Sequence, residues 1–296
     1  RKSGIKTIVW TDSFQTFCLL AALGLILYNV GSQMNLGLGG MAQAIADSDY
    51  SRIFVFDDWA SKQNFFKQFF SGIFITIVMT GLDQDMMQKN LSCKNLQEAQ
   101  KNMYSYGLSF VPVNFLFLSL GVLLLLLASQ VGLTLPEKSD DILPFFAAEG
   151  RLGFATLVFF TIGIVAAAFS SADSALTALT TSFCIDILGI ERKNDPSAEK
   201  KREWSHFFIS VVFIGFILLF KAANNDSIID AIYMIASYTY GPLLGLFVFG
   251  LFTKMRPRDK YVPYVAIASP FICFAIDRIV HQATGYQFGY EMLMFN

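Results

Sequence analysis

The sequence predicts an all-α fold, a polytopic transmembrane helix bundle with about seven spans. Of the 296 residues, 54% are apolar and only 15% are charged, whereas soluble domains average about 45–50% apolar and about 25% charged residues. The apolar residues also gather in runs of about 20, the length that crosses a bilayer as a helix. An open sheet is excluded because it leaves backbone groups unsatisfied in lipid.

The polar stretches between the apolar runs divide the chain into segments. Stretch 132–152 holds Pro136 and Pro144 and is expected to be a loop with a short helix. The pair Gly241-Pro242 interrupts the sixth span, and a proline there frees backbone groups. Both a simple kink and a discontinuous helix on a transport path fit this pair. The expected spans cover residues 5–30, 66–82, 104–131, 153–188, 205–223, 228–252 and 261–280.

Lysine and arginine predict the orientation. With residue 1 in the cytoplasm and alternating spans, the inside loops hold most of the 22 Lys and Arg residues, in stretches 1–6, 89–101, 192–202 and 254–260. This agrees with the positive-inside rule. We therefore expect a multi-pass protein of a plasma membrane, the bacterial inner membrane, with residue 296 outside.

Composition also limits the partners. A net charge of −1 excludes a nucleic-acid partner, which needs a basic surface. No nucleophile–base triad and no Cys/His metal spacing is visible, so an enzyme is not expected. We expect a small-molecule solute, sodium ions and the lipid bilayer as partners, and take a monomer as the working assumption.

Two carboxylates inside spans indicate a functional site, because ionisable groups in lipid are costly. Asp12 lies in the first span, about 9 Å beyond Lys6 at 1.5 Å per residue. It also fits a carboxylate favoured by the helix dipole. Asp173 lies in the fourth span, whose 34 residues from Ala155 to Leu188 are too many for one perpendicular crossing. The two carboxylates are therefore expected at similar depths, where they can meet.

Hydroxyl groups share the helical face of Asp173. Residues Ser170, Asp173, Ser174, Thr177 and Thr181 are spaced by three or four residues. Such a stripe also occurs at ordinary helix–helix contacts. Carboxylate and hydroxyl oxygens with no lysine or arginine at hand suit a hard cation. Sodium (Na+) fits better than a divalent ion because only two full charges are available.

Three stretches resemble the sodium:solute symporter family. Residues 3–15 (SGIKTIVWTDSFQ) resemble its "GG-x-K-A-V-x-W-T-D-x-x-Q" helix start, and residues 81–92 (GLDQDMMQKNLS) resemble "G-x-x-Q-x-x-x-Q-R-x-L-S". Residues 167–186 resemble a signature helix rich in "S-S-x-x-S-x-L". A weaker fourth match is 241–245 (GPLLG). The motifs follow in the family's order over nearly the whole chain.

The resemblance implies a LeuT-type inverted-repeat fold, with residues 1–296 forming part of a single transmembrane transporter domain. The chain would supply the fifth through eleventh helices of that fold. The opening Arg1-Lys2 lacks a Met, so we expect a fragment in which the first helices, and further C-terminal helices, are absent.

Ion sites are implied by position in the family motif. The shared sodium site would use the Ala167 carbonyl and the hydroxyls of Ser170 and Ser171. A further sodium site of some members corresponds to Asp12, Ser170, Asp173 and Ser174. Members commonly have Ser where this chain has Asp173, which leaves the ion stoichiometry open.

Substrate-lining positions in the sugar-transporting branch correspond to Thr76, Met79 and Thr80. The aromatic gate of that branch is not reproduced there, so a sugar does not follow. The expected function is sodium-coupled secondary active symport of a small solute by alternating access. A proton-coupled transporter using Asp12 and Asp173, or a non-transporting sensor on the same fold, remains as the alternative.

Overall fold

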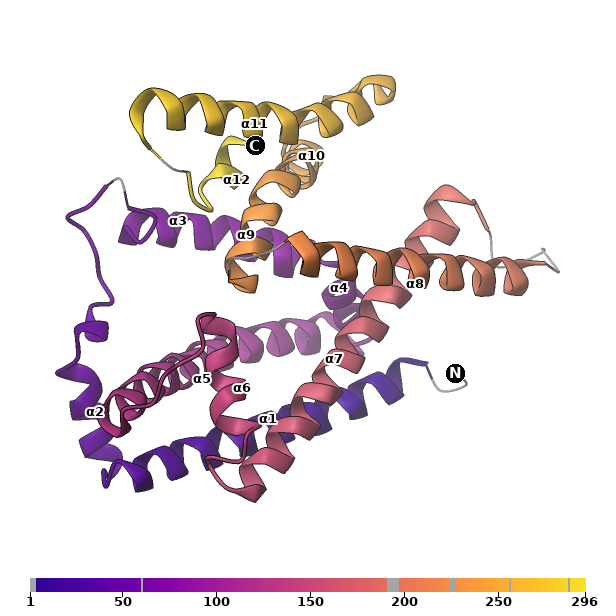
Figure 1. Ribbon diagram of the computed structural model, residues 1–296. Coiled ribbons are helices and arrows are strands. Elements are labelled where there is room, and N and C mark those ends of the chain that lie inside the picture. Colours follow the sequence, from indigo (N-terminus) through magenta and orange to yellow (C-terminus); the bar gives the residue numbers. More distant parts are fainter. Residues whose placement is uncertain (1–3, 60, 191–196, 224–226, 256, 287) are drawn as a thin grey trace. The chain divides into compact units, whose positions relative to one another are not determined.

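The computed structural model describes residues 4–59, 61–190, 197–223, 227–255, 257–286 and 288–296. Within these ranges the regular structure is entirely helical, which confirms the all-α prediction (Figure 1). In chain order the elements are α1 (Gly4–Gln33), α2 (Leu38–Ala46), η1 (Asp49–Ser51), α3 (Phe65–Thr76), η2 (Ile77–Gly81), α4 (Gln84–Leu91), α5 (Leu96–Val131), η3 (Ser139–Asp141), α6 (Ile142–Ala147), α7 (Phe154–Ser182), η4 (Phe183–Ile187), α8 (Ala198–Ala223), α9 (Ile228–Thr239), α10 (Gly241–Phe252), η5 (Asp259–Tyr261), α11 (Val262–Thr284) and α12 (Met292–Phe295).

The helices reproduce the expected spans closely. Among the described residues, five helices are long and apolar enough to cross a membrane, and the bent pair α9–α10 makes six if it counts as one span. The remaining expected span, 66–82, is the shorter apolar helix Phe65–Gly81. It ends in η2, a π-helical turn of five residues. The loop expected over 132–152 contains the short helix α6, as predicted.

The chain divides into two compact units. Unit 1 comprises residues 1–51 and 88–225, and unit 2 comprises residues 52–87 and 226–296. One boundary between the units falls inside α4. The expected single transporter domain stays a prediction.

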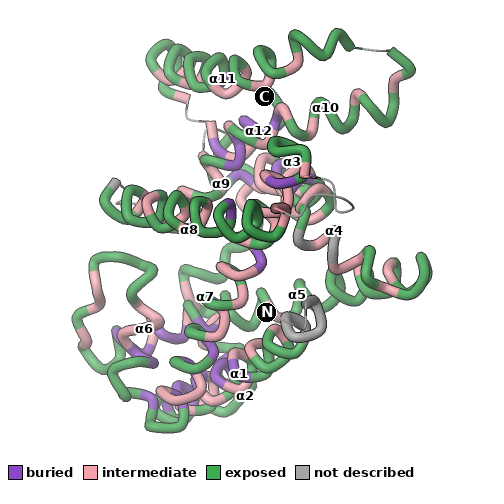
Figure 2. Tube along the Cα trace, turned by 90° about the vertical axis from the view of Figure 1, so that its right-hand side faces the viewer, coloured by how far each residue is buried: buried purple, intermediate pink, exposed green. Residues whose placement is uncertain are grey.

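Unit 1 has an apolar core built by α1, α2, α5, α6 and α7. Buried leucines of α5 pack against one face of α1 and against Phe146 of α6 and Phe160 of α7. Figure 2 shows these buried positions concentrated along α1 and around α6. The core holds α1 against its neighbours and so fixes the face that α1 presents to α7. Its largest α1 and α5 members are Leu23, Ile26, Val30, Leu120, Leu123, Leu124 and Leu127.

Two helices expose apolar side chains along most of their length. In α8, Phe207 is 61% and Leu219 is 72% exposed. In α11, Phe271 is 71% and Ile279 is 65% exposed. Figure 2 shows both helices mostly in the colour of exposed residues. Apolar surface of this extent is typical of helices that contact hydrocarbon.

The pair Gly241-Pro242 breaks the sixth apolar segment, as the sequence indicated. Helices α9 and α10 meet there at a bend of 47°, with Pro242 in the first turn of α10. Carbonyl groups at the end of α9 are thereby left without helical partners. The side-chain amide of Asn296 donates hydrogen bonds to the carbonyls of Ser237 and Tyr238. The freed backbone groups are satisfied within unit 2.

Candidate functional site

Helices α1 and α7 pack side by side and antiparallel in unit 1 (Figure 1). Asn29 Nδ2, near the end of α1, donates to Thr156 Oγ1 at the start of α7 at 3.2 Å. One turn further, Gln33 Nε2 donates to the carbonyl oxygen of Arg151 at 2.9 Å. These two hydrogen bonds set the register of the pair. They bring the beginning of α1 to the second half of α7.

A glycine allows the helices to approach closely in the middle of the pair. Gly163 of α7 is buried against Leu19 of α1, and a Cβ atom at position 163 would lie 2.9 Å from Leu19 Cδ2 and 3.3 Å from its backbone nitrogen. Real Cβ atoms do not approach that closely. Side chains on both sides of this point are therefore within hydrogen-bonding reach across the interface.

Asp12 and Ser170 meet at the far end of the same interface. The Ser170 hydroxyl donates a hydrogen bond to Asp12 Oδ1, and both side chains are partly buried. The sequence predicted that the two carboxylate-bearing segments lie at similar depth, and this contact brings them together. Two side-chain oxygen atoms thus meet between α1 and α7.

Lys89 of α4 forms an ion pair with the other carboxylate oxygen of Asp12. Its Nζ lies 3.2 Å from Asp12 Oδ2, and the side chains are 33% and 29% exposed. The premise that no lysine or arginine lies near the carboxylates is therefore wrong at Asp12. Lys89 belongs to the second family motif, and nothing in helical periodicity relates α4 to α1. Only tertiary packing could reveal this pair.

Two polar atoms beside the Asp12–Ser170 contact have no hydrogen-bond partner. Ser174 is 8% exposed and its Oγ is buried without a partner. The same holds for Oε1 of Gln15, one turn from Asp12 on α1. Buried polar groups are almost always hydrogen-bonded, so these oxygens have unused capacity for a ligand. Sequence reasoning did not single out Gln15, although it closes the first motif.

The other expected ligands differ in exposure. Ala167 and Asp173 are half-buried, whereas Ser171 is exposed. Ser171 follows Ser170 directly, so on a helix its side chain points about 100° away. The Ser171 hydroxyl is thus presented to a different neighbour from that of Ser170. The shared sodium site implied for Ala167, Ser170 and Ser171, and the further site implied for Asp12, Ser170, Asp173 and Ser174, stay predictions.

The expected substrate-lining residues belong to unit 2. Thr76 ends α3, where its Oγ1 donates to the Gly72 carbonyl at 2.7 Å. Met79 and Thr80 lie in η2, whose wider π-helical turn interrupts the α-helical ladder. Such turns are frequent at functional sites because they redirect side chains. The role of these three residues stays a prediction.

Known proteins resemble the chain over most of its length. The model of the sodium:solute symporter family matches residues 3–258. The chain is 25% identical to the sodium/sialic acid symporter SiaT of Proteus mirabilis over 90% of this chain and 54% of that protein. It is also 25% identical to the sodium/sialic acid symporter NanT of Aliivibrio fischeri, over 85% of this chain and 50% of that protein.

A mammalian protein is also similar to this chain over most of the chain's length. The sodium-coupled monocarboxylate transporter 2 of Bos taurus is 26% identical over 84% of this chain and 41% of its own length. The chain spans about half the length, or less, of these curated relatives. No solved structure matches it.

The family match covers all the motifs that carried the resemblance, and that resemblance is confirmed. The matched proteins are transporters, not enzymes, and the long apolar helices indicate a multi-pass membrane protein. The chain belongs to the sodium:solute symporter family.

Proposed function

We propose that the protein couples the entry of sodium to the symport of a small solute by alternating access. The observation that carries this proposal is the meeting of Asp12 with Ser170 between α1 and α7. Ser174 Oγ lies buried one turn along with no hydrogen-bond partner. Hard oxygen ligands of this kind are those that alkali and alkaline-earth cations prefer. Membership of the sodium:solute symporter family supports sodium as the ion.

The ligand assignment follows the family positions. One sodium would be held by the Ala167 carbonyl with the hydroxyls of Ser170 and Ser171. Asp12, Asp173 and Ser174, with Ser170, would form a further sodium site. Binding drives transport only when sodium has a higher affinity for one conformational state than for the other. A ligand set divided between two helices supplies such a difference, because it is complete only when the helices are together.

Lys89 supplies the positive charge that neutralises the Asp12 carboxylate when no sodium ion is bound. Its ammonium group lies 3.2 Å from Asp12 Oδ2, and a sodium ion bound at this carboxylate would compete with it. Sodium binding then releases α4 from α1. In the absence of the ion, Lys89 keeps the partly buried carboxylate from being left unpaired, which would be costly.

The solute is proposed to carry a carboxylate. Relatives in two branches are named for acidic solutes, sialic acid and monocarboxylates. Thr76, Met79 and Thr80 are the proposed lining residues in this chain. An uptake panel of sialic acid, short monocarboxylates, neutral sugars and amino acids, each with sodium or with choline outside, tests this class. Faster uptake of a neutral sugar than of any acid contradicts it.

The proposed location is the bacterial inner membrane, with residue 1 in the cytoplasm and residue 296 outside. The excess of Lys and Arg in the inside loops supports this orientation. Single cysteines placed at residues 94 and 137 test it, because these positions lie in loops on opposite sides. A membrane-impermeant thiol reagent applied from outside is expected to label residue 137 and not residue 94, and the reverse result contradicts the orientation.

The experiment that tests the function is uptake by the natural protein, at its full length, in proteoliposomes. Ser170→Ala and Ser171→Ala are each expected to raise the sodium concentration for half-maximal uptake. Thr161→Ala serves as the control, because Thr161 is an exposed hydroxyl residue on the same helix. Uptake that follows a pH gradient and ignores sodium would instead support the proton-coupled alternative.

A further inference from the structure

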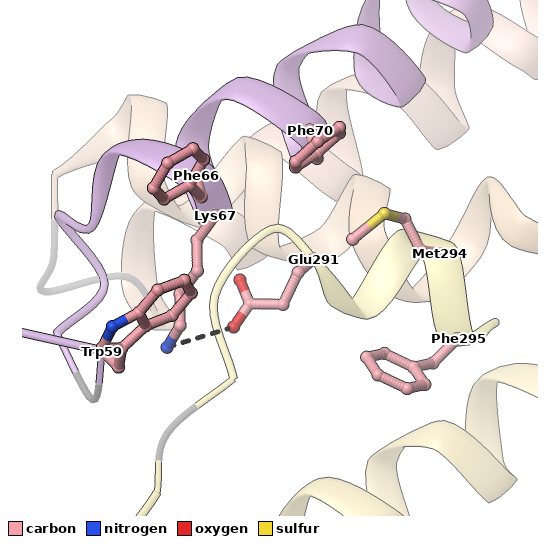
Figure 3. A pocket seen from close by; sticks show the side chains of 7 residues that line it. All are labelled: Trp59, Phe66, Lys67, Phe70, Glu291, Met294 and Phe295. Carbon is pink, nitrogen blue, oxygen red and sulfur yellow. Dashed lines mark ion pairs between the residues drawn. The ribbon is translucent and has the colours of Figure 1, made fainter. Parts of the chain in front are cut away.

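Unit 2 contains a cavity that neither the sodium ligands nor the expected substrate-lining residues reach. Its volume is about 460 Å³, within the range of small-molecule sites. Figure 3 shows that the segment before α3, α3 itself and the segment after α11 form it, with an ion pair between Lys67 and Glu291. Seven residues line it: Trp59, Phe66, Lys67, Phe70, Glu291, Met294 and Phe295.

Lys67 is a buried cation with unused hydrogen-bond donors. Its side chain is 11% exposed, and its Nζ is buried without a hydrogen-bond partner. Glu291 Oε1 lies at 3.8 Å, too far for a hydrogen bond, and the Tyr286 ring centroid lies at 3.9 Å. An ammonium group has three N–H donors. Burying these donors without hydrogen-bond acceptors costs free energy.

The Glu291 carboxylate does not accept a hydrogen bond from the Lys67 ammonium, and it already accepts one from another residue. The Tyr286 hydroxyl donates to Glu291 Oε1 at 2.9 Å, and the Glu291 side chain is only 8% exposed. Burial, and next the hydrogen bond to Glu291, raise the pKa of Tyr286 to about 12. The phenol therefore keeps its proton and keeps its hold on the carboxylate at neutral pH.

The walls of the cavity suit a flat or aliphatic group. Trp59 stacks on Phe66 with ring centroids 5.7 Å apart and planes at 7°. In Figure 3 these two rings lie toward one end of the cavity, and Met294 and Phe295 lie toward the other. The polar groups of Lys67 and Glu291 lie between them. Apolar walls around a small number of polar groups are the usual design of a small-molecule site.

We propose that this cavity binds a small carboxylate with an apolar body, whose carboxylate accepts hydrogen bonds from the Lys67 ammonium while the body packs along Trp59, Phe66 and Phe70. The ligand carboxylate supplies the hydrogen bonds that Glu291 does not make. A ligand cation is disfavoured, because it would meet the Lys67 charge. This site is separate from the proposed sodium ligands and stands whether or not those are correct.

Binding of 3-phenylpropanoate to the purified full-length protein tests the proposal. Its matched probes are 3-phenylpropanol, which has the same body without the charge, and 3-phenylpropylamine, which has the opposite charge. Binding is measured by titration calorimetry and by quenching of Trp59 fluorescence in a variant in which Trp10, Trp204 and any tryptophan outside residues 1–296 are replaced by Phe. The acid is expected to bind at least about tenfold more tightly than either matched probe, as a charge-assisted hydrogen bond predicts.

Substitutions test whether the tighter binding of the acid depends on Lys67. Lys67→Met is expected to weaken binding of the acid about tenfold or more, and Lys67→Arg to retain most of it. Glu291→Gln, which removes the competing charge, is expected to strengthen it severalfold. Lys62→Met is the control, because Lys62 is exposed five residues earlier.

Three results overturn the proposal. The first is the absence of acid binding to the parent protein, and the second is equal binding of acid and alcohol. The third is equal weakening by Lys67→Met and Lys62→Met. If Lys67→Met fails to fold, the Glu291→Gln variant decides, because unchanged or weaker binding of the acid there also overturns the proposal.

Discussion

Ser170 of α7 donates a hydrogen bond to Asp12 of α1 and so closes one end of an antiparallel helix pair. The other end is closed by Gln33, whose amide donates to the carbonyl of Arg151. Between these ends the helices approach closely at Gly163. The position of Asp12 relative to the hydroxyl stripe of α7 therefore depends on the contacts at Gly163 and Gln33, which lie well away from Asp12 and from the stripe.

Gly163→Ala is expected to destabilise the protein. The added methyl group would lie 2.9 Å from Leu19 Cδ2, and overpacking of this kind costs about 1–3 kcal/mol. The measurement is the midpoint of thermal unfolding in detergent. Gly215→Ala in α8 is the control, because a Cβ there meets nothing within 4 Å and alanine favours the helix by up to about 1 kcal/mol. Equal midpoints for both variants would show that the close approach is unimportant.

Lys89→Met is expected to lower the sodium concentration for half-maximal uptake severalfold. The substitution keeps the length of the side chain and removes the ammonium that competes for Asp12. Sodium-dependent uptake in proteoliposomes is the measurement. Lys101→Met, on the exposed first turns of α5, controls for a general loss of positive charge. A lower apparent sodium affinity in Lys89→Met would show that the ion pair supports the site and does not compete with it.

Asp173→Ser introduces the residue that members of the family commonly have. We expect fewer sodium ions per solute, or a weaker sodium dependence, because one carboxylate is lost from the proposed second ion site. Parallel flux measurements with labelled sodium and labelled solute give the ratio. Thr161→Ala, on the same helix, exposed and outside the hydroxyl stripe, is the control. An unchanged ratio and an unchanged pH profile would leave Asp173 with a packing role.

Tyr286 is expected to ionise at unusually high pH. Burial, followed by the hydrogen bond to Glu291, raises its pKa to about 12, above about 10 for a free phenol. Because the pKa is higher in the folded protein than in the unfolded chain, chiefly through burial, the resulting stabilisation of the fold is fully present below about pH 10 and is lost as the pH rises through about 12. The difference in alkaline ultraviolet titration between the parent and Tyr286→Phe isolates this phenol.

Glu291→Gln supplies the matching test of the cause. The substitution removes the negative charge and keeps an acceptor, so the midpoint of the Tyr286 titration is expected to fall toward that of an exposed tyrosine. A midpoint near 10 in the parent protein would mean that the phenol is not held by Glu291.

Much of the helical framework was predictable from the sequence. Span 228–252 was expected to break at Pro242, because proline cannot continue the hydrogen-bond ladder, and α9 and α10 meet there at 47°. The meeting of Asp12 with the second half of α7 was also predictable, because the length of the fourth span implied that Asp173 lies at a depth similar to that of Asp12.

Contacts set by tertiary packing were not predictable in the same way. The pairing of Lys89 with Asp12 joins segments far apart in the sequence, and helical periodicity contains no information on such a contact. The buried Lys67 left a signal, a single lysine within the aromatic run FFKQFF of α3. A lysine among aromatic residues has few ways to remain solvated, and that run could have indicated the cavity.

The length of α7 has a consequence for the bilayer around the protein. Together with η4 it forms an apolar helix of 34 residues, about 51 Å at 1.5 Å per residue, against a hydrocarbon thickness of about 30 Å. Hydrophobic mismatch is relieved by tilting, and tilting displaces the ends of a helix more than its centre. Ser170 lies midway between Phe154 and Ile187, so thinner or thicker membranes would shift the loops that flank this helix and leave the depth of its central turn nearly constant.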